Sequence, residues 1–171
     1  MKLFLIGYMG CGKSAVGTAL SSLTQTPFVD LDDYIENDIG MSIASIFRLK
    51  GESFFRELEQ ESLDEIMRSR SEFVLATGGG TACYGDAVQR MKAAGKVIYL
   101  SGGVDYLLFR LQDSIAKRPL LASKSSEELH AFVSAHLESR EIHYRQADFI
   151  VHVEGKTVNE IALEILDYAS K

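Results

Sequence analysis

The strongest constraint on the fold lies in the first fourteen residues, where an apolar run leads into glycines and a Lys-Ser pair. Residues 3–6 are apolar, and they are followed by a loop whose fixed points are Gly7, Gly12, Lys13 and Ser14. This spacing matches the phosphate-loop pattern G-x-x-x-x-G-K-[ST]. Glycines let the backbone curl until several N–H groups point at one anion, and the positive end of the following helix adds to the attraction. The stretch predicts a strand, a polyphosphate-binding loop and a helix.

The loop residues have separate expected roles. Lys13 is expected to bind the β and γ phosphates of a nucleotide, and the Ser14 hydroxyl to bind Mg²⁺, a hard ion that prefers oxygen ligands. The alternative is an ordinary glycine turn, which we disfavour because position, flanks and residue identities all agree with the motif. The predicted nucleotide-binding set in this loop is Gly10, Cys11, Gly12, Lys13, Ser14 and Ala15.

Composition sets limits on partners and compartment. The chain has 171 residues, 46% of them hydrophobic, which predicts one domain over residues 1–171. The net charge of −6 with scattered basic residues gives no reason to expect a nucleic acid or a membrane surface as partner. Cys11 and Cys83 suggest neither a disulfide framework nor a metal cluster. With no signal peptide and no apolar run of membrane-spanning length, we expect a soluble cytoplasmic protein.

Strand-like and helix-like segments alternate along the chain. We predict helices over residues 13–23, 34–39, 42–50, 52–69, 85–94, 104–111 and 125–144, with a last one after Thr157, and strands over residues 2–6, 28–30, 73–76, 97–100 and 149–153. Residues 112–125 show no clear period and are interpreted as a mobile loop. The alternation predicts an α/β fold with three α/β/α layers, a five-stranded parallel sheet, and ligands at the carboxyl ends of the strands.

Two aspartates follow the second predicted strand. Asp30 and Asp32 are two positions apart, so both carboxylates would point toward the phosphate loop if the extended conformation continued. One would then hold Mg²⁺ through water and the other would accept a hydroxyl proton. The competing interpretation is that Asp32 or Asp33 only caps the next helix. We favour function for Asp30 and Asp32 and assign capping to Asp33.

Arginines stand at several loop and helix-end positions of this acidic chain. Arg56 shares a helical face with Glu52 and Glu59, which alone would be a solvated charge ladder. Arg118, Arg140 and Arg145 are further guanidinium groups with no obvious local partner in the sequence. Because a guanidinium donates two parallel hydrogen bonds and keeps its charge when desolvated, the group indicates a cleft for an anionic substrate.

Three successive glycines follow the third predicted strand. Gly78, Gly79 and Gly80 form either a plain turn or a place where a ligand approaches the backbone closely. We favour the ligand.

Taken together, these residues resemble the shikimate kinase family, over residues 2 to about 168. The phosphate loop alone is too common to say so, and the specificity comes from a set of motifs in order. The set is Phe28-x-Asp30-x-Asp32 with Ile35-Glu36, Ser42-Ile43-Ala44-x-Ile46-Phe47, Gly51-Glu52-x-x-Phe55-Arg56-x-x-Glu59, Gly78-Gly79-Gly80, Arg118-Pro119-Leu120-Leu121 and Arg140-x-x-x-Tyr144-Arg145.

The resemblance implies transfer of the γ-phosphate of ATP to the 3-hydroxyl of shikimate, a step of aromatic amino acid biosynthesis. It also implies a phosphate-loop kinase fold like that of nucleoside monophosphate kinases. By matching position, Lys13 and Ser14 would hold phosphates and Mg²⁺ with Asp30 near the metal, and Asp32 would receive the substrate hydroxyls and act as the base. We expect a monomer whose small-molecule partners are shikimate and ATP.

For the acceptor, the resemblance implies substrate-binding helices over about residues 33–62 and a lid over about residues 112–125. Arg56 and Arg145 would clamp the shikimate carboxylate, and Arg118 on the lid would contact ATP and the transferring phosphate. The remaining substrate contacts implied are the glycine backbone and the pocket walls, namely Gly78, Gly79, Gly80, Phe47 and Phe55.

The chain departs from the family pattern at two places. Residues 141–143 read Glu-Ile-His where the family usually has a proline and a leucine, and residues 111–114 lack an arginine that some members use near adenine. Arg110 and Lys156 are the candidates for adenine contacts. The alternatives are another phosphate-loop kinase, such as a nucleoside monophosphate kinase, or a catalytically silent nucleotide-binding protein.

Overall fold

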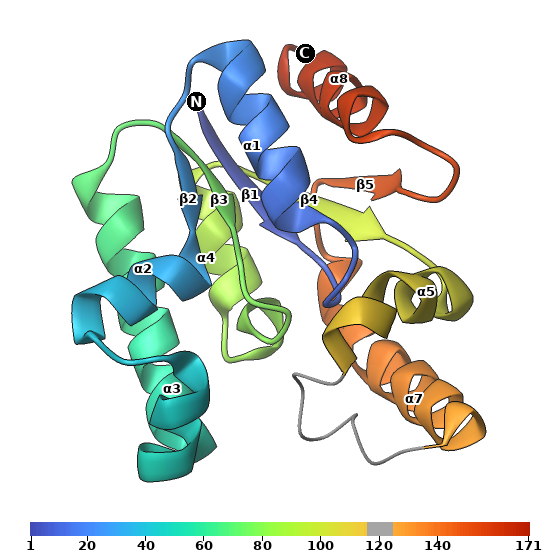
Figure 1. Ribbon diagram of the computed structural model, residues 1–171. Helices are drawn as coiled ribbons and strands as arrows, with labels where there is room; N and C mark the ends of the chain where they lie inside the picture. Colours follow the sequence, from blue (N-terminus) through green and yellow to red (C-terminus); the bar gives the residue numbers. More distant parts are fainter. Residues whose placement is uncertain (116–124) are drawn as a thin grey trace.

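Five parallel strands form one twisted sheet with helices on both faces (Figure 1). The computed structural model describes residues 1–115 and 125–171. The spatial order of the strands is β2-β3-β1-β4-β5. Their bounds are Lys2–Ile6 (β1), Phe28–Asp30 (β2), Phe73–Ala76 (β3), Lys96–Ser101 (β4) and Phe149–His152 (β5). This confirms the predicted five-stranded parallel sheet.

The helices that connect the strands flank the sheet. In chain order they are Lys13–Thr24 (α1), Leu31–Ile39 (α2), Ile43–Ser69 (α3), the 3₁₀ turn Thr81–Cys83 (η1), Ala87–Ala94 (α4), Val104–Ile115 (α5), Ser126–Tyr144 (α7) and Val158–Ala169 (α8). Helices α1 and α8 pack side by side on one face, and α4 packs against β4 on the other (Figure 1). Helices α2 and α3 pack together beyond the β2 edge. The predicted three layers are therefore present.

The central strand explains why the apolar run at the start of the chain is continuous rather than alternating. β1 pairs with β3 on one side and with β4 on the other, with Leu3 opposite Val74 and Lys96. A strand covered on both faces buries every side chain, and residues 3–6 are completely buried. This places the glycine loop that follows β1 at the middle of the sheet's carboxyl edge.

Two helices differ from the prediction in ways that matter for the site. α2 begins at Leu31 rather than near Tyr34, because the Asp30 side chain caps it. α3 joins the two predicted helices, with Gly51 between them at φ 84° and ψ 173°. That left-handed φ suits glycine, so Gly51 forms the kink between the two parts of α3.

The predicted lid is partly helical. Residues 112–115 are the last turn of α5, which is anchored by the buried side chains of Leu107 and Leu111 and packs on α7. The prediction that the loop begins at residue 112 was therefore wrong, because α5 continues for about one more turn, to Ile115. Residues 116–124, with Arg118, lie outside the described residues.

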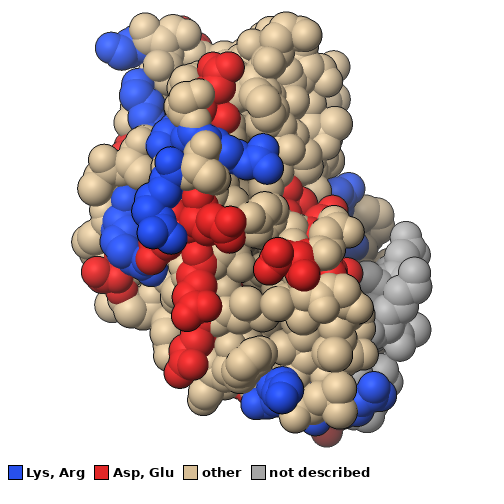
Figure 2. Space-filling model, turned by 90° about the vertical axis from the view of Figure 1, so that its left-hand side faces the viewer, with Lys and Arg blue, Asp and Glu red and all other residues tan. Residues whose placement is uncertain are grey.

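The surface in Figure 2 carries charged groups of both signs. On the face shown in Figure 2, a band of Asp and Glu side chains runs beside a group of Lys and Arg, so neither sign of charge covers this face alone. Among residues 1–115 and 125–171, no helix combines the length and apolar character needed to cross a membrane.

Candidate active site

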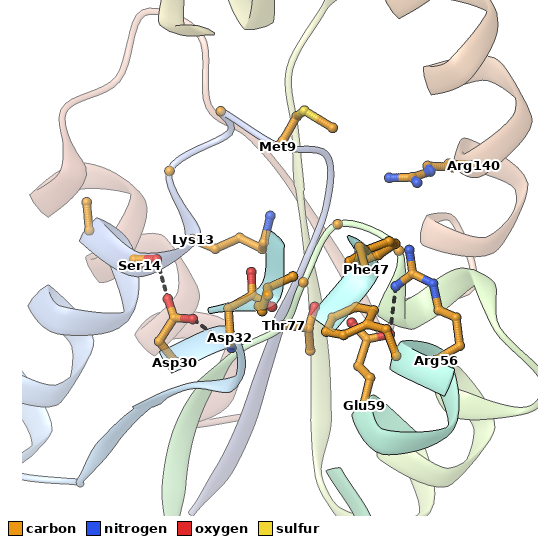
Figure 3. A pocket seen from close by; sticks show the side chains of 18 of the residues that line it. Met9, Lys13, Ser14, Asp30, Asp32, Phe47, Arg56, Glu59, Thr77 and Arg140 are labelled. Carbon is orange, nitrogen blue, oxygen red and sulfur yellow. Dashed lines mark hydrogen bonds and ion pairs between the residues drawn. The ribbon is translucent and has the colours of Figure 1, made fainter. Parts of the chain in front are cut away.

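One pocket lies where β1, β2 and β3 end, and most of the predicted site residues line it (Figure 3). Its volume is about 530 Å³. The predicted residues on its wall are Gly10, Gly12, Lys13, Ser14, Ala15, Asp30, Asp32, Phe47, Phe55, Arg56, Gly78, Gly79 and Gly80. Arg110, a candidate for adenine contacts, also lines it. The parallel topology thus brings the separate motifs to one place, as expected for carboxyl ends of strands.

The loop after β1 has the curled geometry that its glycines predict. Gly10 and Gly12 adopt φ angles of 85° and 97°, which favour glycine, and Gly12 directly precedes α1. Lys13 Nζ donates to the carbonyl oxygens of Gly7 at 2.7 Å and Tyr8 at 3.1 Å. The ammonium group therefore lies across the inside of the loop at the N-terminus of α1, where a phosphate would meet both.

Cys11 is the one predicted loop residue that does not line the pocket. Its side chain is buried beneath the loop, with Sγ 3.7 Å from Lys13 Nζ, and its backbone N–H donates to the Tyr8 carbonyl at 3.3 Å. Because its N–H closes the turn and its thiol packs inward, Cys11 shapes the loop instead of facing the pocket.

Ser14 and Asp30 form a direct pair beside Lys13. The Ser14 hydroxyl donates to Asp30 Oδ2 at 2.6 Å (Figure 3). Mg²⁺ is commonly held in kinases by one or two protein oxygens together with phosphate oxygens and waters. A hydroxyl and a carboxylate in contact at the mouth of a phosphate loop fit that requirement.

The two aspartates reach the pocket by a different route from the one predicted. The strand ends at Asp30, whose Oδ1 accepts the Asp32 N–H at 3.1 Å as the cap of α2. The extended conformation therefore does not continue to Asp32, and the assignment of capping to Asp33 was wrong. Asp32 nevertheless lines the pocket because α2 begins directly at its edge.

The Asp32 carboxyl has an unusual proton affinity. Burial is the largest cause that raises its pKa from 3.8 to about 6, and the nearby negative charges of Asp30 and Glu59 contribute in the same direction, while Lys13 lowers the pKa. A carboxylate with a raised pKa is a stronger proton acceptor than an ordinary aspartate while still ionised at neutral pH. This is the property that a general base needs to take the proton of an attacking hydroxyl group.

Arg56 belongs to a buried network, not to a solvated ladder. Its Nη1 donates to Glu59 Oε2 at 2.8 Å, and Glu59 is completely buried. The other oxygen, Glu59 Oε1, accepts the hydroxyl of Thr81 at 2.6 Å. The predicted face of Glu52, Arg56 and Glu59 exists, but burial of Glu59 turns it toward the pocket.

Phe47 and Phe55 line the pocket beside this network, as predicted. Their ring centroids are 4.7 Å apart, and the Arg56 guanidinium carbon lies 5.2 Å from the Phe55 centroid. The Phe55 ring gives the guanidinium an apolar and electron-rich support, and Phe47 packs against that ring.

The glycines after β3 leave space for charged side chains. A Cβ on Gly80 would come within 2.4 Å of Arg56 Nη2, and one on Gly78 within 2.8 Å of Glu59 Oε1. The Gly79 carbonyl accepts the Tyr144 hydroxyl at 2.5 Å. Gly78 and Gly80 are therefore needed because the Arg56–Glu59 pair lies directly against their backbone.

The arginine prediction for α7 requires a correction. Arg145 ends α7, its side chain is 62% exposed, and it pairs with Glu141 at 2.9 Å outside the pocket. Arg140 lines the pocket instead, with its guanidinium carbon 5.8 Å from the Tyr8 ring centroid. Arg140 stands three residues after buried Leu137 and four before buried Tyr144. It therefore falls on the buried stripe of the helix, a signal that the sequence already contained.

Four more wall residues were not predicted from the sequence. They are Met9, Ile43, Glu59 and Thr77. Among the described residues no cluster of three or more His, Cys, Asp and Glu side chains has the arrangement of a metal site.

Comparisons with known proteins agree with this geometry. A model of the shikimate kinase family matches residues 9–170. A shikimate kinase of Flavobacterium johnsoniae is 40% identical over 167 residues, which cover 97% of each chain. Among solved structures, shikimate kinase from Bacteroides thetaiotaomicron matches with a TM-score of 0.91 at 32% identity, covering 100% of this chain and 99% of that one. Shikimate kinase from Acinetobacter baumannii in complex with shikimate matches with a TM-score of 0.88 at 33% identity, covering 98% and 91%.

Proposed function

The chain belongs to the shikimate kinase family, and we propose on this basis that it transfers the γ-phosphoryl group of ATP to the 3-hydroxyl of shikimate. The supporting observation is one continuous pocket with a phosphate loop at one end and two guanidinium groups at the other. Asp32 lies on its wall between Lys13 and Arg56 (Figure 3). Phosphoryl transfer requires mainly positioning and charge stabilisation from a protein, and this arrangement supplies both.

At the donor end, the loop backbone and Lys13 would bind the phosphates. Ser14 and Asp30 would hold Mg²⁺, which neutralises phosphate charge when bound. Their contact at 2.6 Å already places the hydroxyl and carboxylate oxygens together beside Lys13. Arg110 is the described side chain on the pocket wall that we assign to the adenine side.

At the acceptor end, Arg56 and Arg140 would bind the shikimate carboxylate. The two guanidiniums reach the pocket from α3 and α7, so an anion between them would be gripped from two directions. The rings of Phe47 and Phe55 would pack against the carbon ring of the acid. Asp32, with its raised pKa, would accept the proton of the hydroxyl that attacks the phosphoryl group.

We also propose that the protein acts in the cytoplasm and as a monomer. The donor and acceptor ends of the pocket are both built by residues of one chain. A single copy would therefore be sufficient for the reaction, which sedimentation of the active enzyme would check.

The test is ADP release from Mg-ATP, followed with shikimate, quinate and AMP as separate acceptors. The proposal expects ADP release that depends on shikimate and is largely lost in Arg56→Lys, because a point charge does not replace a planar fork. Turnover with AMP but not with shikimate would favour a nucleoside monophosphate kinase. Binding of ATP without turnover for any acceptor would indicate a silent nucleotide-binding protein.

A further inference from the structure

Arg56 contacts two carboxylates, one buried and one exposed to solvent. Glu59 is completely buried and contacts Arg56 Nη1 at 2.8 Å, whereas the Glu52 side chain is 69% exposed and contacts Nη2 at 3.5 Å. Pairing with Glu59 keeps the guanidinium against the pocket wall, and pairing with Glu52 draws it toward solvent. The balance between the two decides where Arg56 presents its N–H groups.

The inner carboxylate has its own anchor. Thr81 is completely buried at the start of η1, and its hydroxyl donates to Glu59 Oε1 at 2.6 Å. The Thr81 backbone is fixed as well, because its N–H donates to the Gly78 carbonyl at 3.3 Å. Both oxygens of Glu59 therefore have a donor, one from Thr81 and one from Arg56.

Room for this bond is built into the backbone. A Cβ on Gly78 would lie 2.8 Å from Glu59 Oε1 and 3.1 Å from Thr81 Oγ1. A side chain at position 78 would press on both partners, so the glycine preserves the contact as well as the pocket.

We propose that Thr81 is a positioning residue for acceptor binding, since its hydrogen bond fixes Glu59 and thereby holds Arg56 facing the pocket. Without the hydroxyl, a buried carboxylate oxygen would lose its donor, and the carboxylate would turn toward other donors. Arg56 would then follow Glu59 or shift to Glu52. This inference rests on the proposed function, in which Arg56 binds the carboxylate of shikimate.

The experiment compares Thr81→Val, which keeps the shape and removes the donor, with Thr81→Ser, which keeps the donor. Thr81→Val is expected to raise KM for shikimate about tenfold, with kcat and KM for ATP within about twofold of wild type. Thr81→Ser is expected to keep KM for shikimate close to the wild-type value, because it keeps the hydroxyl donor. Thr26→Val, at a buried threonine outside the pocket, controls for the effect of such a substitution on stability.

A double-variant cycle tests the route through Glu59. In a Glu59→Gln background, Thr81→Val is expected to change KM for shikimate less than about twofold, because the two residues act in series. If the increases in KM for shikimate multiply in the double variant, or if Thr81→Val has a wild-type KM, the positioning role of Thr81 is overturned. The proposed function would not be affected by either result. Absence of shikimate turnover in the wild type would overturn the proposed function and this role with it.

Discussion

The Tyr8 hydroxyl and His136 Nδ1 are hydrogen-bonded at 2.8 Å, although 128 positions separate them in the sequence. Tyr8 belongs to the phosphate loop, and His136 lies on α7 one turn before Arg140. The Tyr8 ring also supports the Arg140 guanidinium at 5.8 Å. One side chain of the nucleotide loop therefore contacts the helix that carries a proposed acceptor-binding residue.

Removing the Tyr8 hydroxyl should affect stability more than substrate binding. Tyr8→Phe keeps the ring under Arg140 and removes the bond to His136, so it should cost about 1 kcal/mol of unfolding free energy and leave KM for shikimate within about twofold. Tyr8→Leu removes the aromatic support as well and should raise KM for shikimate. Denaturant unfolding and steady-state kinetics on the two variants measure the two effects separately. Equal KM values in both would show that the ring does not support Arg140.

Two arginines at the end of α7 make a matched pair. Arg140→Ala should raise KM for shikimate roughly 10- to 100-fold, because hydrogen bonds between charged groups contribute about 1.5–3 kcal/mol. Arg145→Ala should leave KM for shikimate within about twofold, because Arg145 is exposed and pairs along its own helix with Glu141. Initial-rate kinetics with varied shikimate decide between them. The opposite ranking would restore Arg145 to the site and remove Arg140.

Ionised Asp32 should lower the stability of the protein at the neutral pH where it would act as a base. Its pKa is raised from 3.8 to about 6, so its contribution to folding is fully present below pH 4 and is lost as the pH rises through 6. At pH 7.5 the free energy of unfolding of Asp32→Asn should therefore exceed that of wild type by roughly 1–3 kcal/mol, with a correspondingly higher melting temperature. Near pH 4 the two proteins should have nearly the same stability. The same variant should lose most of kcat. A stability difference that does not vary between pH 4 and 7.5 would contradict the raised pKa.

The pH dependence of catalysis is a second test of the raised pKa of Asp32. Since protonated Asp32 does not accept a proton, kcat/KM should fall as the pH drops below about 6. A pH profile of kcat/KM under saturating Mg-ATP measures this. A profile that stays flat down to pH 4.5 would remove Asp32 from the role of base.

Gly80 should tolerate a methyl group in folding but not in acceptor binding. The three atoms nearest to the added Cβ would all belong to the guanidinium of Arg56, at 2.4–2.7 Å, and the end of a long side chain can move aside. Gly80→Ala should therefore keep its melting temperature within a few degrees while KM for shikimate rises. Gly103→Ala is the control, because the atoms nearest to its Cβ among the described residues also belong to a side-chain end, the Glu154 carboxylate, outside the pocket. Similar kinetics in the two variants would show that Gly80 does not set the place of Arg56.

Local patterns were enough to predict the elements that build the site. The strand-glycine-helix order around Lys13 is determined within a few residues, and so are the predicted helix starts at Ser125 and Thr157, where the structure shows capping boxes with Glu128 and Glu160. The route of the chain at Asp30 was not predicted correctly, because an aspartate after a strand can continue the strand or cap a helix. Capping prevails here because its carboxylate meets the Asp32 N–H.

Burial was harder to predict than position. A charge ladder such as Glu52, Arg56 and Glu59 has the same spacing whether it faces water or a pocket, and only the packing of η1 against α3 shows that Glu59 is inside. Thr81 gave no sequence signal because its role depends on a carboxylate 22 positions away. Arg140 was named among the candidate arginines, and extending the buried stripe of Leu137 and Tyr144 along α7 could have favoured it over Arg145.

The most direct test of the proposed reaction is to follow the γ-phosphoryl group itself. Phosphorus NMR of a reaction with Mg-ATP and shikimate should show the phosphoryl group on the 3-hydroxyl of shikimate, formed in equal amount with ADP, and Arg140→Ala should slow its appearance at low shikimate far more than Arg145→Ala. Phosphate released only as the free inorganic ion, or attached to another acceptor in preference to shikimate, would contradict the claim that this pocket joins a phosphate donor to a carboxylate clamp.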